Sequence, residues 1–430
     1  MVWLNWSILF LVFETIAIIV LLFLLFLALF EPGLDYKIST PVTAPLESED
    51  FLRSLEGLTD AKVHRQTHIE VLTNGEVYYE AELAAIRLAK ETINLEAYIF
   101  QKGEVAGRFL DVLTERAKAG VKVNLVLDTL GSFASWNSYF AELTKAGGQV
   151  AWYHPLRWQT IARINNRTHR ELIIVDGRVG FIGGAGFADH WLIGKEKHPR
   201  WRDTMFRVEG DAVLGLQSTF AENWLEASGE IIGGAEYFPP SQREDESCAL
   251  IVNSSPSAGR STRARMLYQT LLHAAQRKIL ITTPYFLPDK SARRELVCAI
   301  KDRGVEMKII TPGDHNDHTI VRRSSRRLYG DLLEAGAEIY EYQAAMIHAK
   351  ILIIDDCWSV VGSTNFDNRS FGLNDEVNLA TYDKHLAARL TEDFTRDLTE
   401  SRQVSLEEWN KRGLLERAHE QVGRVFERQQ

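Results

Sequence analysis

Cysteine is scarce in this sequence, with only three residues among 430, Cys248, Cys298 and Cys357. An odd, sparse set without a C-x-x-C spacing supports neither a disulfide framework nor a zinc site. Cys357 ends an apolar run, so buried packing is the role we expect for it. Fold stability and chemistry must therefore come from other residue types, and we predict no metal site and no cofactor.

Positive charge is also in short supply. Lys and Arg number 49 against 58 Asp and Glu, which gives a formal net charge of −9 and a pI of about 5.8. General nucleic-acid binders are usually basic, so we do not expect nucleic acid as a partner, although local patches can oppose the net sign. The apolar content of 45% is ordinary for a globular protein. The length allows two or three domains, or one duplicated unit.

One long stretch lacks charge almost entirely. Residues 7–30 contain a single charged side chain, Glu14, and a helix of this length can span a bilayer core of about 30 Å. A cleaved signal peptide fits less well, because no Lys or Arg precedes the run and the run exceeds a usual h-region. We therefore predict an uncleaved, single-pass transmembrane helix within residues 1–30. Lys37 and Arg53, the first positive charges after it, favour a cytoplasmic catalytic part.

Beyond this helix, strand and helix patterns alternate, and the same order occurs twice. Strand, helix and strand are predicted at residues 93–100, 107–119 and 121–127, and again at 278–283, 292–301 and 305–310. Helix-to-strand passages also recur from Ala141 and from Asp331, each followed by a histidine, an apolar strand, an aspartate and a glycine-containing turn. Such self-similarity indicates duplication. Alternating elements predict an α/β fold, with two fused repeats of mixed β-sheet flanked by helices.

Glycine, proline and charge clusters set the expected domain boundaries. We predict a linker at residues 31–60, a first domain at 61–228, a linker between the repeats at 229–260, a second domain at 261–404 and a C-terminal helix at 405–430.

The second repeat contains a group of residues suited to a phosphate. His348 and Lys350 alternate along a predicted strand and so point the same way. Lysine supplies positive charge, and Ser363 and Asn365 supply polar contacts to phosphate oxygens. Glu376 lies further along and could orient the imidazole, as a carboxylate often does beside histidine.

The spacing H-x-K-x4-D, which ends at Asp355, followed by G-S-x-N resembles the HKD motif of the phospholipase D superfamily. Residues 282–289, 332–342 and 365–378 are similar to segments of bacterial cardiolipin synthases, and the resemblance covers roughly residues 65–400. It implies two motifs that face each other across one site, and a catalytic role for Lys350 and Asp355. It further implies phospholipid substrates, phosphatidylglycerol among them, and a place in the bacterial inner membrane.

The first repeat departs from this motif. His169 and Asp176 keep the spacing of seven, but Glu171 stands where the family has lysine. Gly184 and Gly186 stand where the family often has serine and has asparagine. By the family's pattern, Asp176 belongs to the catalytic set, and Asp203 resembles the acidic partner of the first histidine.

A carboxylate beside a phosphodiester repels it unless the carboxylate is protonated or paired with a cation. Arg167, two residues before His169, shares its face if the strand begins that early. We therefore expect Arg167 or Arg163 to neutralise Glu171 or to replace the missing lysine, which places Glu171 and Arg167 in the substrate-binding set.

The resemblance implies a covalent mechanism, in which one histidine attacks phosphorus and the other transfers protons. Family roles make His169 the nucleophile and His348 the acid and base. Asp176 and Asp355 each end a strand, where a turn role competes with a catalytic one. The expected reaction joins two phosphatidylglycerols into cardiolipin and glycerol. A phospholipase D-type hydrolase, a transferase with another alcohol, a phosphodiesterase nuclease and a lipid-binding scaffold with a degenerate first motif remain alternatives. The oligomeric state is left open.

Overall fold

The computed structural model describes residues 6–30, 36–40, 42–155, 163, 165–195, 198–241, 247–256 and 262–413. The first half contains α1 (Trp6–Phe30), α2 (Glu49–Thr59), β1 (Val63–Thr73), α3 (Gly75–Arg87), β2 (Thr92–Ala97), α4 (Glu104–Lys118), β3 (Lys122–Asp128), α5 (Ala141–Lys145), β4 (Gln149–Tyr153), β5 (Leu172–Val175), β6 (Val179–Gly183), β7 (Thr204–Gly210) and α6 (Ala212–Ser228).

The second half contains β8 (Ser247–Ser254), α7 (Arg263–Ala274), β9 (Lys278–Thr282), β10 (Phe286–Leu287), α8 (Lys290–Arg303), β11 (Glu306–Pro312), α9 (Thr319–Arg327), α10 (Gly330–Ala335), β12 (Glu338–Tyr342), β13 (Ile351–Ile354), β14 (Trp358–Gly362), β15 (Phe366–Asp367), α11 (Asn368–Gly372), β16 (Glu376–Tyr382), α12 (Lys384–Thr399), β17 (Ser401–Val404) and α13 (Leu406–Asn410).

The order of the strands in the sheet reflects the duplication of the chain. One sheet runs β17-β12-β11-β9-β13-β14-β16-β8-β1-β7-β6-β5-β2-β3-β4, and its order is nearly a mirror image about the β8–β1 contact. The two halves join there through antiparallel pairing of Val63 with Leu250 and His64 with Ala249. Parallel and antiparallel pairs coexist, as in β2–β3 and β2–β5, so the predicted α/β class with mixed sheet is confirmed.

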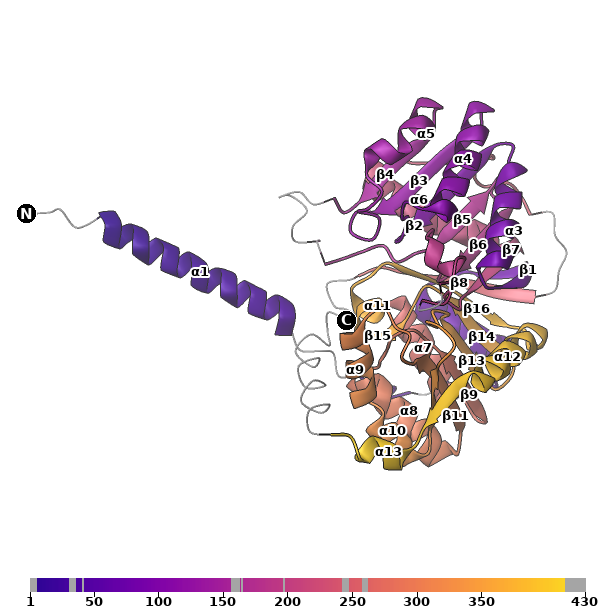
Figure 1. Ribbon diagram of the computed structural model, residues 1–430. Coiled ribbons are helices and arrows are strands. Elements are labelled where there is room, and N and C mark those ends of the chain that lie inside the picture. The colour runs from indigo at the N-terminus through magenta and orange to yellow at the C-terminus, as the bar shows by residue number, and fades with distance from the viewer. Residues whose placement is uncertain are drawn as a thin grey trace, which may run out of the picture.

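Three apolar clusters hold the layers together. One packs the α3 and α4 side of the first half, and one packs the α2, α7 and α8 side of the second half. The third draws on β5 and α6 from the first half and on β13 and α12 from the second. Figure 1 shows the two halves as stacked lobes with their helices outside. The shared cluster fixes the halves relative to each other, and this places residues from both at one site.

Two expected linkers contain regular structure. Residues 31–60 include α2, whose Phe51, Leu52 and Leu55 are buried against the second half. Residues 229–260 include β8, which lies at the centre of the sheet. Glycine and proline in these segments predicted linkers, but each segment also contains apolar residues that the fold buries. Of the expected C-terminal helix, α13 ends at Asn410, and residues 414–430 lie outside the described part of the chain.

The N-terminal run forms α1, which lies apart from the two lobes in Figure 1. Its large apolar side chains from Ile8 to Phe23 are between 49% and 70% exposed. Measured over the residues that the structure describes, no helix has the length and apolarity that a membrane crossing requires.

Candidate active site

The two motif histidines lie where the halves meet. His169 immediately follows a bridge between Thr168 and Asp375, and its backbone N–H donates to the Asp375 carbonyl at 2.9 Å. His348 follows a matching bridge between Arg202 and Ile347, and its N–H donates to the Arg202 carbonyl at 2.7 Å. Each histidine is therefore fixed by backbone from the opposite repeat.

The carboxylate partners are crossed in the same way. Nδ1 of His169 lies 3.1 Å from both carboxylate oxygens of Glu376, which is fully buried. Nδ1 of His348 lies 2.9 Å from Oδ2 of Asp203, also fully buried. The sequence assigned Asp203 to the first histidine and Glu376 to the second, and both assignments were wrong. The acidic residues belong to the expected orienting set, but each orients the histidine of the other repeat.

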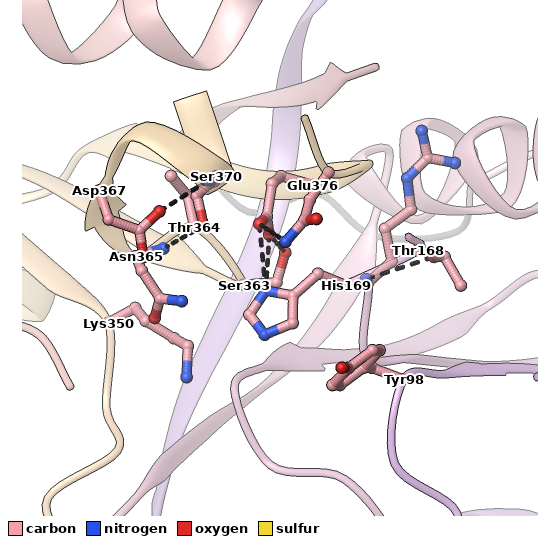
Figure 2. Close-up of polar contacts among 12 residues, drawn as sticks. Tyr98, Thr168, His169, Lys350, Ser363, Thr364, Asn365, Asp367, Ser370 and Glu376 are labelled. Carbon is pink, nitrogen blue, oxygen red and sulfur yellow. Dashed lines mark hydrogen bonds and ion pairs between the residues drawn. The ribbon is translucent and has the colours of Figure 1, made fainter. Parts of the chain in front are cut away.

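Glu376 is itself held by neighbours. Ser363 Oγ donates to its Oε2 at 2.5 Å (Figure 2). The Asn374 amide nitrogen lies 3.5 Å from its Oε1. An imidazole that donates Nδ1–H to a fixed carboxylate keeps its Nε2 lone pair free. Ser363, expected to bind substrate, therefore acts on the site through Glu376.

Lys350 carries the positive charge of the site. Its Nζ lies 2.9 and 3.1 Å from Nδ1 and Nε2 of His348, and donates to the His348 carbonyl at 2.8 Å. Burial lowers the pKa of Lys350 to about 8, although the carboxylates of Asp203 and Glu376 oppose that change. Figure 2 shows its amine and the Asn365 amide directed toward the space beside the His169 ring. A cation and an amide beside a histidine suit an anionic phosphodiester.

The surroundings of His348 and Asp203 lower the pKa of both residues. Burial and the charge of Lys350 lower the pKa of His348, although Asp203 opposes them. For Asp203, burial alone would raise the pKa, but the hydrogen bond and charge of His348 and the charge of Lys350 together lower it. A bound phosphodiester would add negative charge nearby, and so raise the pKa of His348 toward the range where it can donate a proton.

A pocket of about 640 Å³ opens beside His169, a size typical of small-molecule sites. Its polar lining includes Arg167 and Asn365, and its apolar lining includes Ile320 and Val321 from α9. The full lining is Tyr98, Arg167, His169, Tyr285, Asp317, His318, Thr319, Ile320, Val321, Asn365, Asp367, Arg369 and Asn374. A pocket with charged and apolar walls can accept an amphipathic ligand.

Three aromatic residues beside the two histidines were not predicted from the sequence, because their positions carry no repeated pattern. Tyr98 packs edge-to-face against His169 with ring centres 5.5 Å apart. Trp191 and Trp201 lie 5.5 and 5.3 Å from the His348 ring, and the Trp191 indole N–H donates to Asp203. Trp201 begins the W-R-D-T segment that contains Asp203, and Trp191 precedes that segment. The available signal was therefore a pair of tryptophans close in sequence to an expected histidine partner.

Asp176 and Asp355 serve the fold. The Asp176 carboxylate accepts the backbone N–H groups of Lys90, Glu91 and Thr92, which open β2. Asp355 does the same for residues 276–278, which open β9. Both occupy the left-handed region, with φ of 52° and 51°. Seven extended residues cover about 23 Å, so each aspartate lies at the opposite end of its strand from the histidine. The expected catalytic role is corrected to a structural one.

The arginines do not reach Glu171. Arg163 donates to Glu226 at 2.6 Å, and the Arg167 guanidinium lies 3.6 Å from Asp128. Arg167 remains a wall of the pocket. The nearby cation that stabilises the ionised form of Glu171 is Lys350, from the other repeat.

A duplicated α/β sheet, with one carboxylate-paired histidine per repeat, defines the phospholipase D-like class. A family model described as "Cardiolipin synthase, PLD-like domain" matches residues 83–194 and 268–398. Cardiolipin synthase 2 of Bacillus anthracis is 34% identical over 88% of this chain and 74% of its own, and the major cardiolipin synthase of Bacillus subtilis is 35% identical over 89% and 80%. The chain belongs to the cardiolipin synthase family of phospholipase D-like proteins.

Solved structures agree on the fold. The phosphatidylserine synthase of Haemophilus influenzae Rd KW20 aligns with a TM-score of 0.65 at 15% identity, over 88% of this chain and 96% of that one. At this identity the likeness supports the two-repeat architecture alone.

Proposed function

We propose that the protein transfers a phosphatidyl group from one phosphatidylglycerol to a second, which forms cardiolipin and releases glycerol. The crossed pairs His169–Glu376 and His348–Asp203, at the junction of the two repeats, carry this proposal together with the pocket that opens beside His169. Membership of the cardiolipin synthase family supports the choice of substrate.

His169 is the nucleophile. Its Nε2 attacks phosphorus while Nδ1–H stays bonded to Glu376, and a phosphohistidine forms as the bond to the glycerol oxygen breaks. His348 gives the leaving oxygen its proton. The hydroxyl of the second phosphatidylglycerol then loses its proton to His348 and attacks phosphorus, which frees His169. Lys350 and Asn365 hold the oxygens of the reacting phosphate, and Arg167, at the pocket wall, attracts the phosphate of the second phosphatidylglycerol.

Residues 7–30 attach the protein to the membrane in this proposal. The run contains one charged residue, and the described apolar side chains of α1 are exposed and unpacked. Apolar surface of this kind is stable in lipid rather than in water. Under the positive-inside rule, Lys37 and Arg53 favour a cytoplasmic position for the catalytic lobes at the bacterial inner membrane.

A second apolar surface would bring the pocket to the bilayer. Leu130 and Phe133, in the loop after β3, are 44% and 65% exposed. Their loop is tied to the pocket, because Ser132 Oγ donates to the carbonyl of the pocket residue Tyr98 at 2.9 Å. Ile320, on the α9 side of the pocket, is 55% exposed. Exposed aromatic and aliphatic residues at a lipid pocket suit the interfacial zone of a membrane.

Replacing Leu130 and Phe133 together by serine is therefore expected to lower turnover on phosphatidylglycerol vesicles by about tenfold, since about 1.4 kcal/mol of interfacial contact corresponds to that factor. Turnover on a short-chain phosphatidylglycerol below its micelle concentration should change little. Leu88→Ser is the matched control, because Leu88 is 75% exposed near the start of β2, at the opposite end from Tyr98. Equal losses on both substrates would contradict a membrane contact.

The function itself is tested with purified full-length protein and phosphatidylglycerol vesicles, with lipid products identified by mass spectrometry. Cardiolipin with equimolar glycerol is the expected result. Phosphatidic acid would indicate the hydrolase instead. Lipid binding without turnover would indicate the scaffold, and either result would overturn the proposal.

A further inference from the structure

Glu171 occupies the position where the motif of the second repeat has Lys350. Its side chain is 4% exposed. Oε1 accepts the backbone N–H groups of Tyr98 and Ile99 at 3.1 and 3.3 Å. Oε2 is buried and has no hydrogen-bond partner among the described residues. Oε1 of Glu171 thus links the segment after β2 to the first motif, while Oε2 makes no hydrogen bond to the described residues.

The glycines that follow β6 make room for this arrangement. A Cβ at Gly186 would stand 3.1 Å from Oε1 of Glu171 and 2.7 Å from the Ile99 carbonyl. A Cβ at Gly184 would stand 2.8 Å from Cδ and Nζ of Lys350. The side chain of Lys350 therefore reaches from the second repeat into space that the first repeat leaves empty. Gly184 and Gly186 thus leave the space that the Lys350 side chain and the Glu171 carboxyl group occupy.

The charge balance around Lys350 decides the protonation state that the site can use. The acidic residues whose ionised forms would act on Lys350 are Asp203, Glu376, Glu171 and Asp317. Asp203 and Glu376 already serve as the hydrogen-bond partners of the two histidines. An ionised Glu171 would add a third buried carboxylate beside the single lysine, and the cluster would repel a phosphodiester anion.

We infer that Glu171 is a positioning residue that works as a neutral carboxylic acid. Its carbonyl oxygen holds the Tyr98 and Ile99 amides, and Tyr98 in turn packs on His169. Its second oxygen carries a proton, so Lys350 is left free of a third carboxylate and keeps its charge for phosphate. The effect on catalysis rests on the proposed function. The protonation state of Glu171 does not depend on that function.

The groups that face Glu171 agree with a bound proton. Burial raises the pKa of Glu171 well above its ordinary value, and Glu96 acts in the same direction. The two backbone N–H groups and Lys350 oppose that rise and are outweighed. Tyr79 and Tyr98 are the phenols near Glu171, and burial raises the pKa of both, so they remain neutral.

Activity separates a neutral role from an anionic one. Glu171→Ala removes the acceptor for two amides beside the pocket and should raise KM by about tenfold, the value of one lost hydrogen bond to a buried group. Glu171→Gln should recover most of that loss, because its amide oxygen accepts the same two N–H groups without charge. Equal damage from glutamine and alanine would overturn the inference.

The pH dependence provides a sharper readout. The p-nitrophenyl ester of phosphatidic acid needs no protonation of its leaving group, so its burst rate at high pH follows the loss of the Lys350 proton near pH 8. If Glu171 is neutral, Glu171→Gln leaves this midpoint in place. If Glu171 is ionised, glutamine removes a negative charge and moves the midpoint at least about one unit lower, a result that contradicts the inference.

Infrared spectroscopy supplies a test independent of activity. The wild-type spectrum at pH 7 minus that of Glu171→Gln should contain the band of a protonated carboxylic acid, and a carboxylate band there would overturn the inference. Glu82→Gln is the matched control, because Glu82 is 2% exposed, has a pKa raised by burial, and lies on α3 away from the pocket. It should remove its own acid band without altering KM or the burst midpoint. If the wild type forms no cardiolipin, the proposed function fails, while the infrared result still reports on Glu171.

Discussion

Replacing His169 by alanine is expected to abolish phosphatidyl transfer even when the leaving group needs no proton. With the p-nitrophenyl ester, His169→Ala should release no burst of p-nitrophenolate, because no nucleophile remains to form the covalent bond. Replacing His348 should leave one equivalent of burst per enzyme and then stall, since the second step still requires a base to activate the incoming hydroxyl. Steady-state turnover should fall by at least about 10⁴-fold in both variants.

The burst assigns the two roles. Stopped-flow absorbance measures it directly, and thermal unfolding of both variants checks that the folds are intact. A burst in His169→Ala together with none in His348→Ala would reverse the assignment of nucleophile and proton carrier. An undiminished steady state in either variant would remove that histidine from the mechanism.

Much of the fold could be predicted because its signals are local. The strand, helix and strand expected at residues 93–127 correspond to β2, α4 and β3, and their counterparts in the second half correspond to β9, α8 and β11. Apolar periodicity and a glycine at each helix end were sufficient there. The motif histidines and Lys350 were also local signals, since their spacing resembles the HKD motif and recurs in part in the first repeat.

The crossed pairing was not accessible in this way. Asp203 and His348 lie 2.9 Å apart in space but belong to different repeats. Their contact depends on how the repeats pack through the shared apolar cluster, which no single repeat encodes. For Asp176 and Asp355 the sequence offered both a turn role and the catalytic role of the motif, and the hydrogen bonds favour the turn role. In an extended chain the spacing of seven separates the ends of a strand by about 23 Å.

Because Glu376 contacts His169 and Asp203 contacts His348, the two acids should affect different chemical steps. Glu376 should affect formation of the phosphohistidine, and Asp203 its breakdown. Glu376→Gln can no longer hold the Nδ1–H of His169 in the same orientation, so attack by Nε2 should slow by about 10²- to 10⁴-fold, and the burst with the p-nitrophenyl ester should slow with it. Asp203→Asn acts on His348 instead. It should leave the burst nearly intact and slow the later turnover by a similar factor.

Pairing within each repeat would invert this result, because Asp203→Asn would then suppress the burst and Glu376→Gln the turnover. Asp176→Asn is a suitable control, since its carboxylate accepts three backbone N–H groups at the start of β2, far from both imidazoles. It should lower the free energy of unfolding by about 1–3 kcal/mol and leave the burst rate unchanged. Because each acid comes from the repeat opposite to its histidine, neither repeat holds a complete catalytic pair by itself. The effects of Glu376→Gln and Asp203→Asn on the two chemical steps therefore depend on the packing between the halves.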